Sequence, residues 1–178
     1  MRPGTRERTW WGGRAADGVD ALALRSGLSR FATGVCVVTV AGEDGAHGLT
    51  VNAFTAVSLD PPLVLVSIGK NARGHRLLGE GPFAVNVLGA EQEAVARHFS
   101  GDPHPESVYW TEGRTAPTLA GALATFECRP WCTYDGGDHS LFVGEVVHLD
   151  YRAGDGLGYF SSRFATVEEP GLGVEYLL

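Results

Sequence analysis

The sequence has little of several features that mark other classes of protein. It contains one lysine, one methionine and three cysteines in 178 residues, and an odd number of cysteines gives no disulfide framework, which favours a reducing compartment. No apolar run approaches the roughly 20 residues of a membrane-spanning helix. The charged N-terminus is not followed by the apolar segment of a secretory signal. We therefore expect a cytoplasmic protein that is not integral to a membrane.

Several familiar catalytic and nucleotide-binding motifs are missing as well. The chain has no G-x-G-x-x-G in a strand–helix unit, no Walker loop, no H-E-x-x-H and no G-x-S-x-G elbow. Cys128 and Cys132 are four residues apart, so on a strand they face the same way. Two thiolates without clustered histidines make a weak zinc site, and we interpret both as packed free thiols. We expect no metal.

Charge is distributed unevenly along the chain. There are 14 Lys and Arg against 21 Asp and Glu, a formal net charge of −7, yet residues 1–30 hold six Arg against three acids. The remaining residues, 31–178, carry enough net negative charge to repel a phosphate backbone, which argues against nucleic-acid binding. The window 61–79 has no acid, and its basic residues are Lys70, Arg73, His75 and Arg76. This cluster indicates either a site for a small anion such as phosphate or a solvated basic turn.

What is present fits one globular domain. A chain of 18.9 kDa, 44% apolar and 20% charged, buries roughly 70% of its unfolded surface and supports a real core. We expect an N-terminal arm over 1–18, disordered or docked through Trp10 and Trp11, and a single domain over 19–178.

Apolar and β-branched runs separated by turn residues predict a mainly β protein. We expect strands over 36–41, 49–55, 56–59, 63–68, 83–88, 122–134 and 140–151. The run 63–68 is continuously apolar, as in a strand covered on both faces. In the last strand, Leu141, Val143, Val147 and Leu149 are expected to share one face. Strands at short spacing with few helices favour a β-barrel over a βαβ sheet.

Helical periodicity is confined to short segments. Asp20 is a candidate N-cap for a helix that presents Leu24, Leu28 and Phe31 on one face. A second helix is expected over 91–99, with Val95 and Phe99 inward and His98 structural. Residues 101–121 have few periodic apolar positions and are expected to form a long loop.

Two further segments carry polar groups of interest. Thr50 and Asn52 share a strand face between apolar neighbours, which indicates the polar wall of a ligand groove or a solvent face near a turn. Gly137-Asp138-His139 leads into the strand over 140–151. A histidine at the mouth of a strand meets a ligand or is simply exposed at a hairpin turn.

Several segments, in this order, resemble the short-chain flavin reductase family, the reductase components of two-component flavin monooxygenases. The resemblance runs from about Phe31 to Val167. The matching motifs are Phe31-Ala32-Thr33-Gly34-Val35, Gly48-Leu49-Thr50-Val51-Asn52-Ala53-Phe54, Pro61-Pro62-Leu63-Val64, Phe83-Ala84-Val85-Asn86-Val87-Leu88, Gly137-Asp138-His139 with Gly144-Glu145-Val146, and Gly158-Tyr159-Phe160 with Arg163-Phe164.

The resemblance implies a split β-barrel of the FMN-binding, Greek-key-like type, in a homodimer with flavin at the interface. It implies an NAD(P)H:flavin oxidoreductase that uses FMN or FAD with NADH or NADPH and transfers reduced flavin to a partner monooxygenase. Hydride transfer is then the cofactors' own chemistry, so we expect no essential general base. The alternatives are a flavin-binding electron carrier and a pathway-specific flavin-dependent oxidase with its own organic substrate.

The resemblance also assigns roles to residues. A flavin ring would lie against Thr50, Val51, Asn52, Ala53 and Phe54. The phosphate and ribityl chain would be held by Lys70, Asn71, Ala72 and Arg73. His139 would be the catalytic residue beside the nicotinamide, and nicotinamide or flavin would also contact Asp138, Phe160 and Arg163. Many relatives have hydroxyl residues where this chain has Ala72 and Gly74, so fewer donors are expected to weaken flavin binding.

Overall fold

The computed structural model describes residues 19–171, so the expected arm over 1–18 and its tryptophan pair lie outside the described residues. The described strands are β1 (Thr33–Gly34), β2 (Cys36–Gly42), β3 (Gly45–Val51), β4 (Phe54–Leu59), β5 (Pro62–Gly69), β6 (Phe83–Val87), β7 (Trp110–Glu112), β8 (Pro117–Leu119), β9 (Ala124–Gly136), β10 (His139–Tyr151), β11 (Gly156–Phe160) and β12 (Arg163–Val167). The described helices are α1 (Ala21–Leu28), α2 (His75–Glu80), α3 (Glu93–Phe99) and the 3₁₀ turns η1 (Ala90–Gln92) and η2 (Pro105–Ser107).

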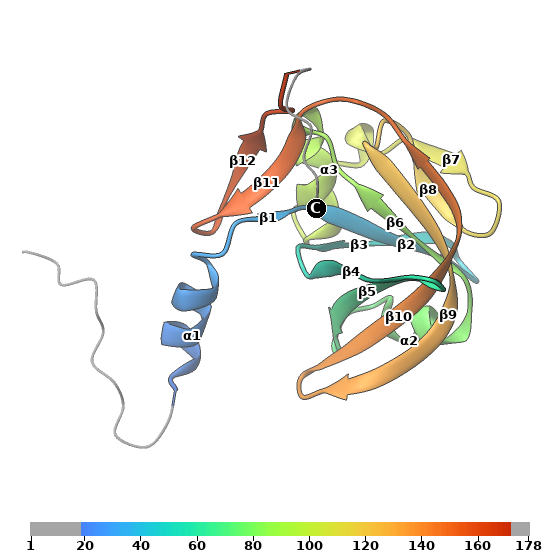
Figure 1. Ribbon diagram of the computed structural model, residues 1–178, viewed down its shortest axis with the longest axis horizontal. Coiled ribbons are helices and arrows are strands. Elements are labelled where there is room, and N and C mark those ends of the chain that lie inside the picture. The colour runs from blue at the N-terminus through green and yellow to red at the C-terminus, as the bar shows by residue number, and fades with distance from the viewer. Residues whose placement is uncertain (1–18, 172–178) are drawn as a thin grey trace, which may run out of the picture.

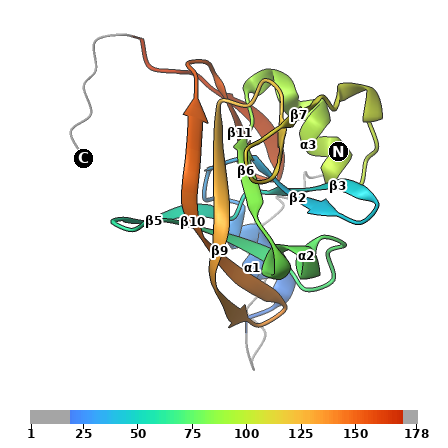
Figure 2. The ribbon, with the colours of Figure 1, turned by 90° about the vertical axis from the view of Figure 1, so that its right-hand side faces the viewer.

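A curled antiparallel sheet forms the body of the molecule (Figures 1 and 2). Its seven strands run in the order β3-β2-β6-β9-β10-β5-β4, while β1, β11 and β12 form a smaller sheet beside it and β7 pairs with β8. The expected mainly β fold is thereby confirmed. Among residues 19–171, no helix is long and apolar enough to cross a membrane.

The core has two parts, one on each side of β2. Inside the curl, alternate residues of β2, β5 and β6 pack together, for example Val38, Val66 and Val85. On the other side of β2, Val37 packs against Val95 of α3 in a second cluster. Because both faces of β2 are covered, five consecutive residues of this strand, from Cys36, are buried.

Burial on both faces was expected for 63–68, and this prediction is wrong for the single chain. Val64, Val66 and Ile68 are buried, while the intervening Leu63 and Leu65 are only half-buried. Within residues 19–171, the pleat of β5 alternates between fully buried residues on its core face and half-buried residues on its outer face.

The expected strand over 49–55 is interrupted. β3 ends at Val51, and β4 begins at Phe54. β3 pairs with β2, whereas Phe54 lies opposite Val66 of β5, so the chain turns a corner at Asn52 and Ala53. The carbonyl of Ala53 accepts a hydrogen bond from the Ser67 amide at 3.0 Å, which fixes this corner beside β5.

The long loop expected over 101–121 contains the β7–β8 hairpin. Buried polar side chains on the outer face of the sheet hold it in place. Asn86 accepts a hydrogen bond from the Leu119 amide at 2.9 Å, and the Thr39 hydroxyl donates to the Pro117 carbonyl. Glu127, only 2% exposed, accepts hydrogen bonds from the Thr115 amide and hydroxyl. These anchors lie on distant strands, and apolar periodicity does not reveal them.

β-Bulges overturn two expectations about shared faces. In β10, the register shifts after Val143 and again after Val146, so Val143 is buried while Val147 and Leu149 are exposed. In β9, Cys132 lies opposite Val143 and Pro130 opposite Gly144, which leaves Trp131 as the extra residue. Cys128 therefore points into the core and Cys132 to the outer face. The helix α2 and the hairpin β11–β12 were not predicted.

Helix α1 begins as expected but ends at Leu28, before Phe31, and does not pack on the body. The Asp20 side chain accepts a hydrogen bond from the Ala23 amide at 3.1 Å and caps the helix. The helix has no buried residue, and Leu24, Leu28 and Phe31 are all at least half exposed. Figure 1 shows α1 standing away from the sheet.

Candidate functional site

The corner between β3 and β4 carries the residues expected to face a flavin ring. The Thr50 hydroxyl donates to the carbonyl of Ala96 in α3 at 2.7 Å, so this polar group anchors the helix. Val51 and Phe54 pack against the core. Asn52 and Ala53 are exposed, and within the described residues the Asn52 side chain makes no hydrogen bond. The Asn52 side chain is thus an open polar group of this segment, whereas the Ala53 carbonyl is already bonded to the Ser67 amide.

The loop 70–74 follows β5 and carries the cations expected to hold a phosphate. Lys70 pairs with Asp135 at 2.8 Å, and this contact lowers the pKa of the aspartate. Arg76 faces Glu80 at 3.6 Å. Within residues 19–171, Arg73 has neither a hydrogen-bond nor an ion-pair partner, so its charge is the most available to an anion.

The backbone of this loop is also suited to an anion. The amides of Lys70, Ala72 and His75 donate to backbone carbonyls, whereas the described chain offers no acceptor to the amides of Asn71, Arg73 and Gly74. Free amides beside an unpaired guanidinium are the donors that phosphate requires. A Cβ on Gly74 would lie 2.8 Å from Leu49 Cδ1, so glycine lets the loop approach β3 closely.

The β9–β10 turn lies beside this loop. His139 is opposite Gly69 in the β5–β10 ladder, and the Lys70 amide donates to the Asp138 carbonyl at 3.0 Å. His139 Nδ1 is 2.7 Å from Asp138 Oδ1. This hydrogen bond and the histidine charge lower the pKa of Asp138. Because an ionised carboxylate only accepts hydrogen bonds, Nδ1 carries the proton and the other nitrogen, Nε2, is left for a ligand.

A pocket of about 590 Å³ opens between the β3 end and the β11–β12 hairpin. Its walls come from β3, α3 and the hairpin, and are lined by Val35, Thr50, Val51, Asn52, Glu93, Arg97, Ser100, Tyr159, Ser162, Arg163 and Phe164. A volume of this size suits a nucleotide-sized ligand. The hairpin turns through Ser161 and Ser162, both with positive φ, which brings Arg163 to the pocket while Phe160 lies outside its lining.

The single chain therefore brings the predicted site residues together in two groups. The first group joins Lys70–Arg73 to Asp138 and His139, and the second joins Thr50–Asn52 to Arg163. The ends of β3, β4 and β5 lie between the two hairpin turns (Figure 1), and the Ala53–Ser67 hydrogen bond links the groups. Lys70–Arg73 and His139 are not part of the pocket lining.

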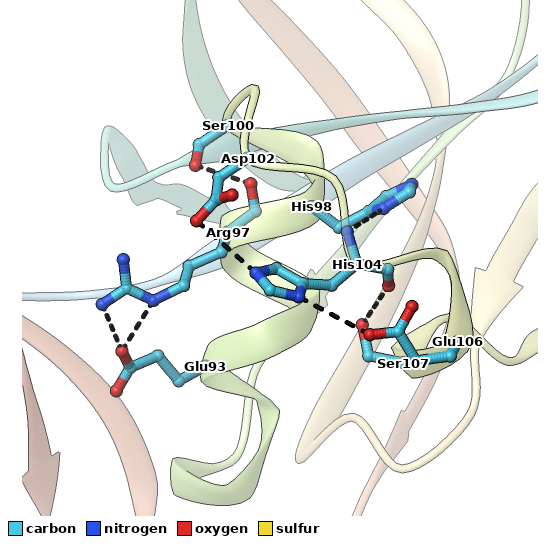
Figure 3. A network of polar contacts seen from close by, with 8 residues as sticks. All are labelled: Glu93, Arg97, His98, Ser100, Asp102, His104, Glu106 and Ser107. Atoms are coloured by element: carbon cyan, nitrogen blue, oxygen red, sulfur yellow. Dashed lines mark hydrogen bonds and ion pairs between the residues drawn. The ribbon is translucent and has the colours of Figure 1, made fainter.

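The α3 wall of the pocket was missed in the sequence. Arg97 is bound to Glu93 one helical turn earlier through Nε and Nη2, at 2.9 and 2.6 Å (Figure 3). Its guanidinium carbon lies 5.3 Å from the centre of the Phe164 ring. The i,i+4 spacing of the two charges was a readable signal, but it marks any exposed helix and does not indicate a pocket.

His98 in the last turn of α3 and His104 after it both have partners within the chain. His98 Nδ1 accepts a hydrogen bond from the His104 amide at 2.9 Å, and His104 lies between Asp102 and Glu106 (Figure 3). Among the described residues, no group of three metal-ligating side chains is present. Burial raises the pKa of the Cys36 and Cys128 thiols to about 12, so both stay protonated at neutral pH.

The curled sheet carries the cationic loop 70–74 and, near it, the pocket between β3 and the β11–β12 hairpin. These are features of a protein that binds a phosphorylated cofactor. Residues 28–168 match the model of the flavin reductase-like domain, and the chain belongs to that family. The match spans both groups of candidate residues.

Individual relatives agree with this assignment. The chain is similar to an NADH-dependent flavin reductase of a Rhodococcus species, with 43% identity over 155 residues, 84% of this chain and 88% of that protein. It is 38% identical to the reductase component of 4-hydroxyphenylacetate 3-monooxygenase of Thermus thermophilus, over 83% of this chain and 97% of the relative.

A similar solved structure is an NADH:FAD oxidoreductase of Streptomyces globisporus in complex with NAD and FAD fragments. The two structures superimpose with a TM-score of 0.80 and 41% sequence identity, and the match covers 90% of this chain and 100% of that one.

Proposed function

We propose that the protein is an NADH-dependent flavin reductase that supplies reduced flavin to a separate monooxygenase component. The observation that carries the proposal is the contact between the phosphate-type loop and the β9–β10 turn, where Gly69 lies opposite His139 and Lys70 donates to Asp138. A reductase needs a flavin site and a nicotinamide site side by side. The named activities of the relatives, NADH-dependent flavin reductase and monooxygenase reductase component, support the same function.

The donor set fits a flavin phosphate. Arg73 and the free amides of Asn71 and Gly74 would hold it, with Lys70 shared between the phosphate and Asp135. The absence of hydroxyls at Ala72 and Gly74 leaves charge and backbone to provide the binding. Loose binding suits a reductase that releases its reduced product, and we propose FMN and FAD as the flavins accepted.

His139 would act by orientation and proton handling. When bound, the flavin supplies the redox chemistry by accepting a hydride at its N5 atom. Asp138 holds the imidazole by Nδ1 and so directs Nε2 toward the space above Gly69. There Nε2 would accept a hydrogen bond from the nicotinamide carboxamide, and when the imidazole is protonated Nε2 would donate its proton to the reduced flavin anion. Alignment of this kind supplies up to about 7–11 kcal/mol of barrier lowering in well-ordered systems, so no general base is needed.

The test is NADH consumption by the purified protein with FMN, FAD or riboflavin under oxygen, with a flavin-free reaction as the control. We expect multiple turnovers that require added flavin but no organic substrate. An electron carrier would bind flavin without sustained turnover, and a self-contained oxidase would turn over only with its own substrate. Either result would contradict the proposal.

We propose further that two chains associate through the outer face of β9, β10, β5 and β4. Directly opposed residues share this face: Val143 faces both Cys132 and Leu65, and Leu141 lies next to Ser67. Trp131 projects from the bulge and is 54% exposed. An apolar sheet face whose Leu63, Leu65 and Leu141 are only half-buried by their own chain suits a second copy of that face, and Ala53 and His139 lie at its edge.

We also propose that the protein works in the cytoplasm. All three cysteines are free thiols, two of them buried, which suits a reducing compartment. Fractionation of the native cells, with an immunoblot against the protein, would check the location.

A further inference from the structure

The pocket beside α3 contains one acidic side chain among two cations. Glu93 is the single carboxylate in its lining, and Arg97 and Arg163 supply the positive charge. Both members of the Glu93–Arg97 pair are nearly half exposed at the pocket wall, so they are accessible to a ligand. The aromatic rings of Tyr159 and Phe164, 5.5 Å apart, complete this end of the pocket.

The two arginines differ in what they offer to a ligand. Within the described residues Arg163 has no polar partner, so it is available to any phosphate. Arg97 is held by Glu93 through two nitrogens and by the Phe164 face. Its charge is therefore largely neutralised, and an additional phosphate placed here would meet the Glu93 carboxylate at close range.

This arrangement distinguishes the two nicotinamide dinucleotides. NADH and NADPH share the diphosphate and differ only at the 2′ position of the adenosine ribose. A carboxylate accepts hydrogen bonds from ribose hydroxyls and repels a 2′-phosphate, whereas a free arginine favours the phosphate. We propose that the α3 wall of the pocket receives the adenosine ribose of the dinucleotide and that the Glu93–Arg97 ion pair sets the preference for NADH over NADPH.

The proposal rests on the proposed reductase function, because it needs a dinucleotide whose nicotinamide end reaches the flavin. The pocket extends from Asn52, at the corner expected to face the flavin ring, to Glu93 on α3. Glu93 and Arg97 are thus positioned to act on specificity and not on hydride transfer. The diphosphate, common to both dinucleotides, would bind Arg163.

The test is the dissociation constant of NAD⁺ and of NADP⁺, measured by calorimetry on the flavin-free protein, with the KM values for NADH and NADPH as a second readout. The key variant is Glu93→Gln, which keeps the side-chain shape but frees Arg97. We expect it to tighten NADP⁺ binding about tenfold or more, equivalent to about 1.4 kcal/mol, and to change NAD⁺ binding much less. The double variant Glu93→Gln/Arg97→Gln should lose that gain.

The matched control is Glu91→Gln, which also breaks a Glu–Arg pair, here with Arg152 at 2.8 Å, but lies outside the pocket. It should leave the ratio of the two dissociation constants unchanged. The proposal is overturned if Glu93→Gln leaves that ratio unchanged, or if Glu91→Gln shifts it equally. If the wild-type protein reduces flavin with NADH but Glu93→Gln leaves the ratio unchanged, only this inference fails; if the wild-type protein neither binds NAD⁺ nor oxidises NADH, the proposed function fails as well.

Discussion

At the scale of single residues, the candidate site depends on which charges are already satisfied. Lys70 and Arg76 have carboxylate partners, whereas Arg73 has none within residues 19–171. His139 is held at one nitrogen by Asp138 and is open at the other. The same distinction separates Arg163 from Arg97 in the pocket. Residues of one type therefore differ in function because of their partners.

Replacing His139 with alanine should lower the rate of flavin-dependent NADH oxidation by tenfold or more, about 1.4 kcal/mol in barrier height. The reason is loss of the group that orients the nicotinamide. Stopped-flow measurement at 340 nm checks this, with His148→Ala, farther along the same strand, as the control. An unchanged rate in His139→Ala would remove this residue from the site.

Replacing Lys70 and Arg73 together with alanine should raise the dissociation constant of FMN markedly. Added salt should weaken wild-type binding more than variant binding, because the lost contribution is electrostatic. Titration of flavin fluorescence at two salt concentrations measures both effects. Arg76→Ala, whose charge faces Glu80, is the control. Superimposable titration curves would identify the cluster as a surface turn.

At the scale of elements, buried polar groups decide where segments dock. The β7–β8 hairpin is held by Thr39, Asn86 and Glu127, which are all buried on the outer face of the sheet. Burial raises the pKa of Glu127, but hydrogen bonds from Arg114, Thr115 and Ala116 outweigh it and hold the pKa below its usual value. The ionised carboxylate is therefore the form that fastens the hairpin.

The Glu127→Gln variant should be destabilised at neutral pH by about 1–3 kcal/mol, the usual cost of disturbing buried hydrogen bonds to a charged group. A lowered pKa stabilises the fold above the ordinary carboxyl pKa, and this contribution disappears as the pH falls through the lowered value. Denaturant unfolding of both proteins should thus give stability curves that converge in acid. Glu112→Gln, exposed on β7, is the control, and a constant difference at all pH values would contradict the account.

At the scale of the whole molecule, the single chain leaves surfaces uncovered. Helix α1 buries none of its residues, and the outer face of β5 and β10 carries half-buried leucines. An eight-residue helix has little stability in isolation. Both features suit an assembly of two chains, in which apolar surface on one copy is covered by the other.

Placing a charge on the sheet face should break the proposed dimer. In Leu65→Glu, a carboxylate would enter the apolar interface unpaired, which is strongly unfavourable. Light scattering coupled to size exclusion should show a dimer for the wild-type protein and a monomer for the variant. Val167→Glu, at an exposed position of β12 outside this face, should remain dimeric. A dimeric Leu65→Glu protein would exclude this interface.

Much of the fold was predictable from local sequence. β-Branched and apolar runs bounded by turn residues located the strands β2, β5, β6, β9 and β10, because strand and turn preferences act over a few neighbouring residues. Asp20 correctly indicated the start of α1. The corner at Asn52, the bulge at Trp131 and the β7–β8 hairpin were missed, because each depends on a strand that is distant in the chain.

For the candidate site too, local sequence predicted some features, and others depend on contacts between distant parts of the chain. Local composition was enough to single out the acid-free segment around Arg73, the turn at His139 and the polar pair Thr50 and Asn52, since glycines and charged side chains stand out among apolar strands. Only the tertiary structure shows that Thr50 anchors α3, that the Arg73 loop lies beside His139, and that Glu93 and Arg97 line the same pocket as Asn52. Strand pairing and helix packing join residues far apart in the chain, and no local pattern records which of them will meet.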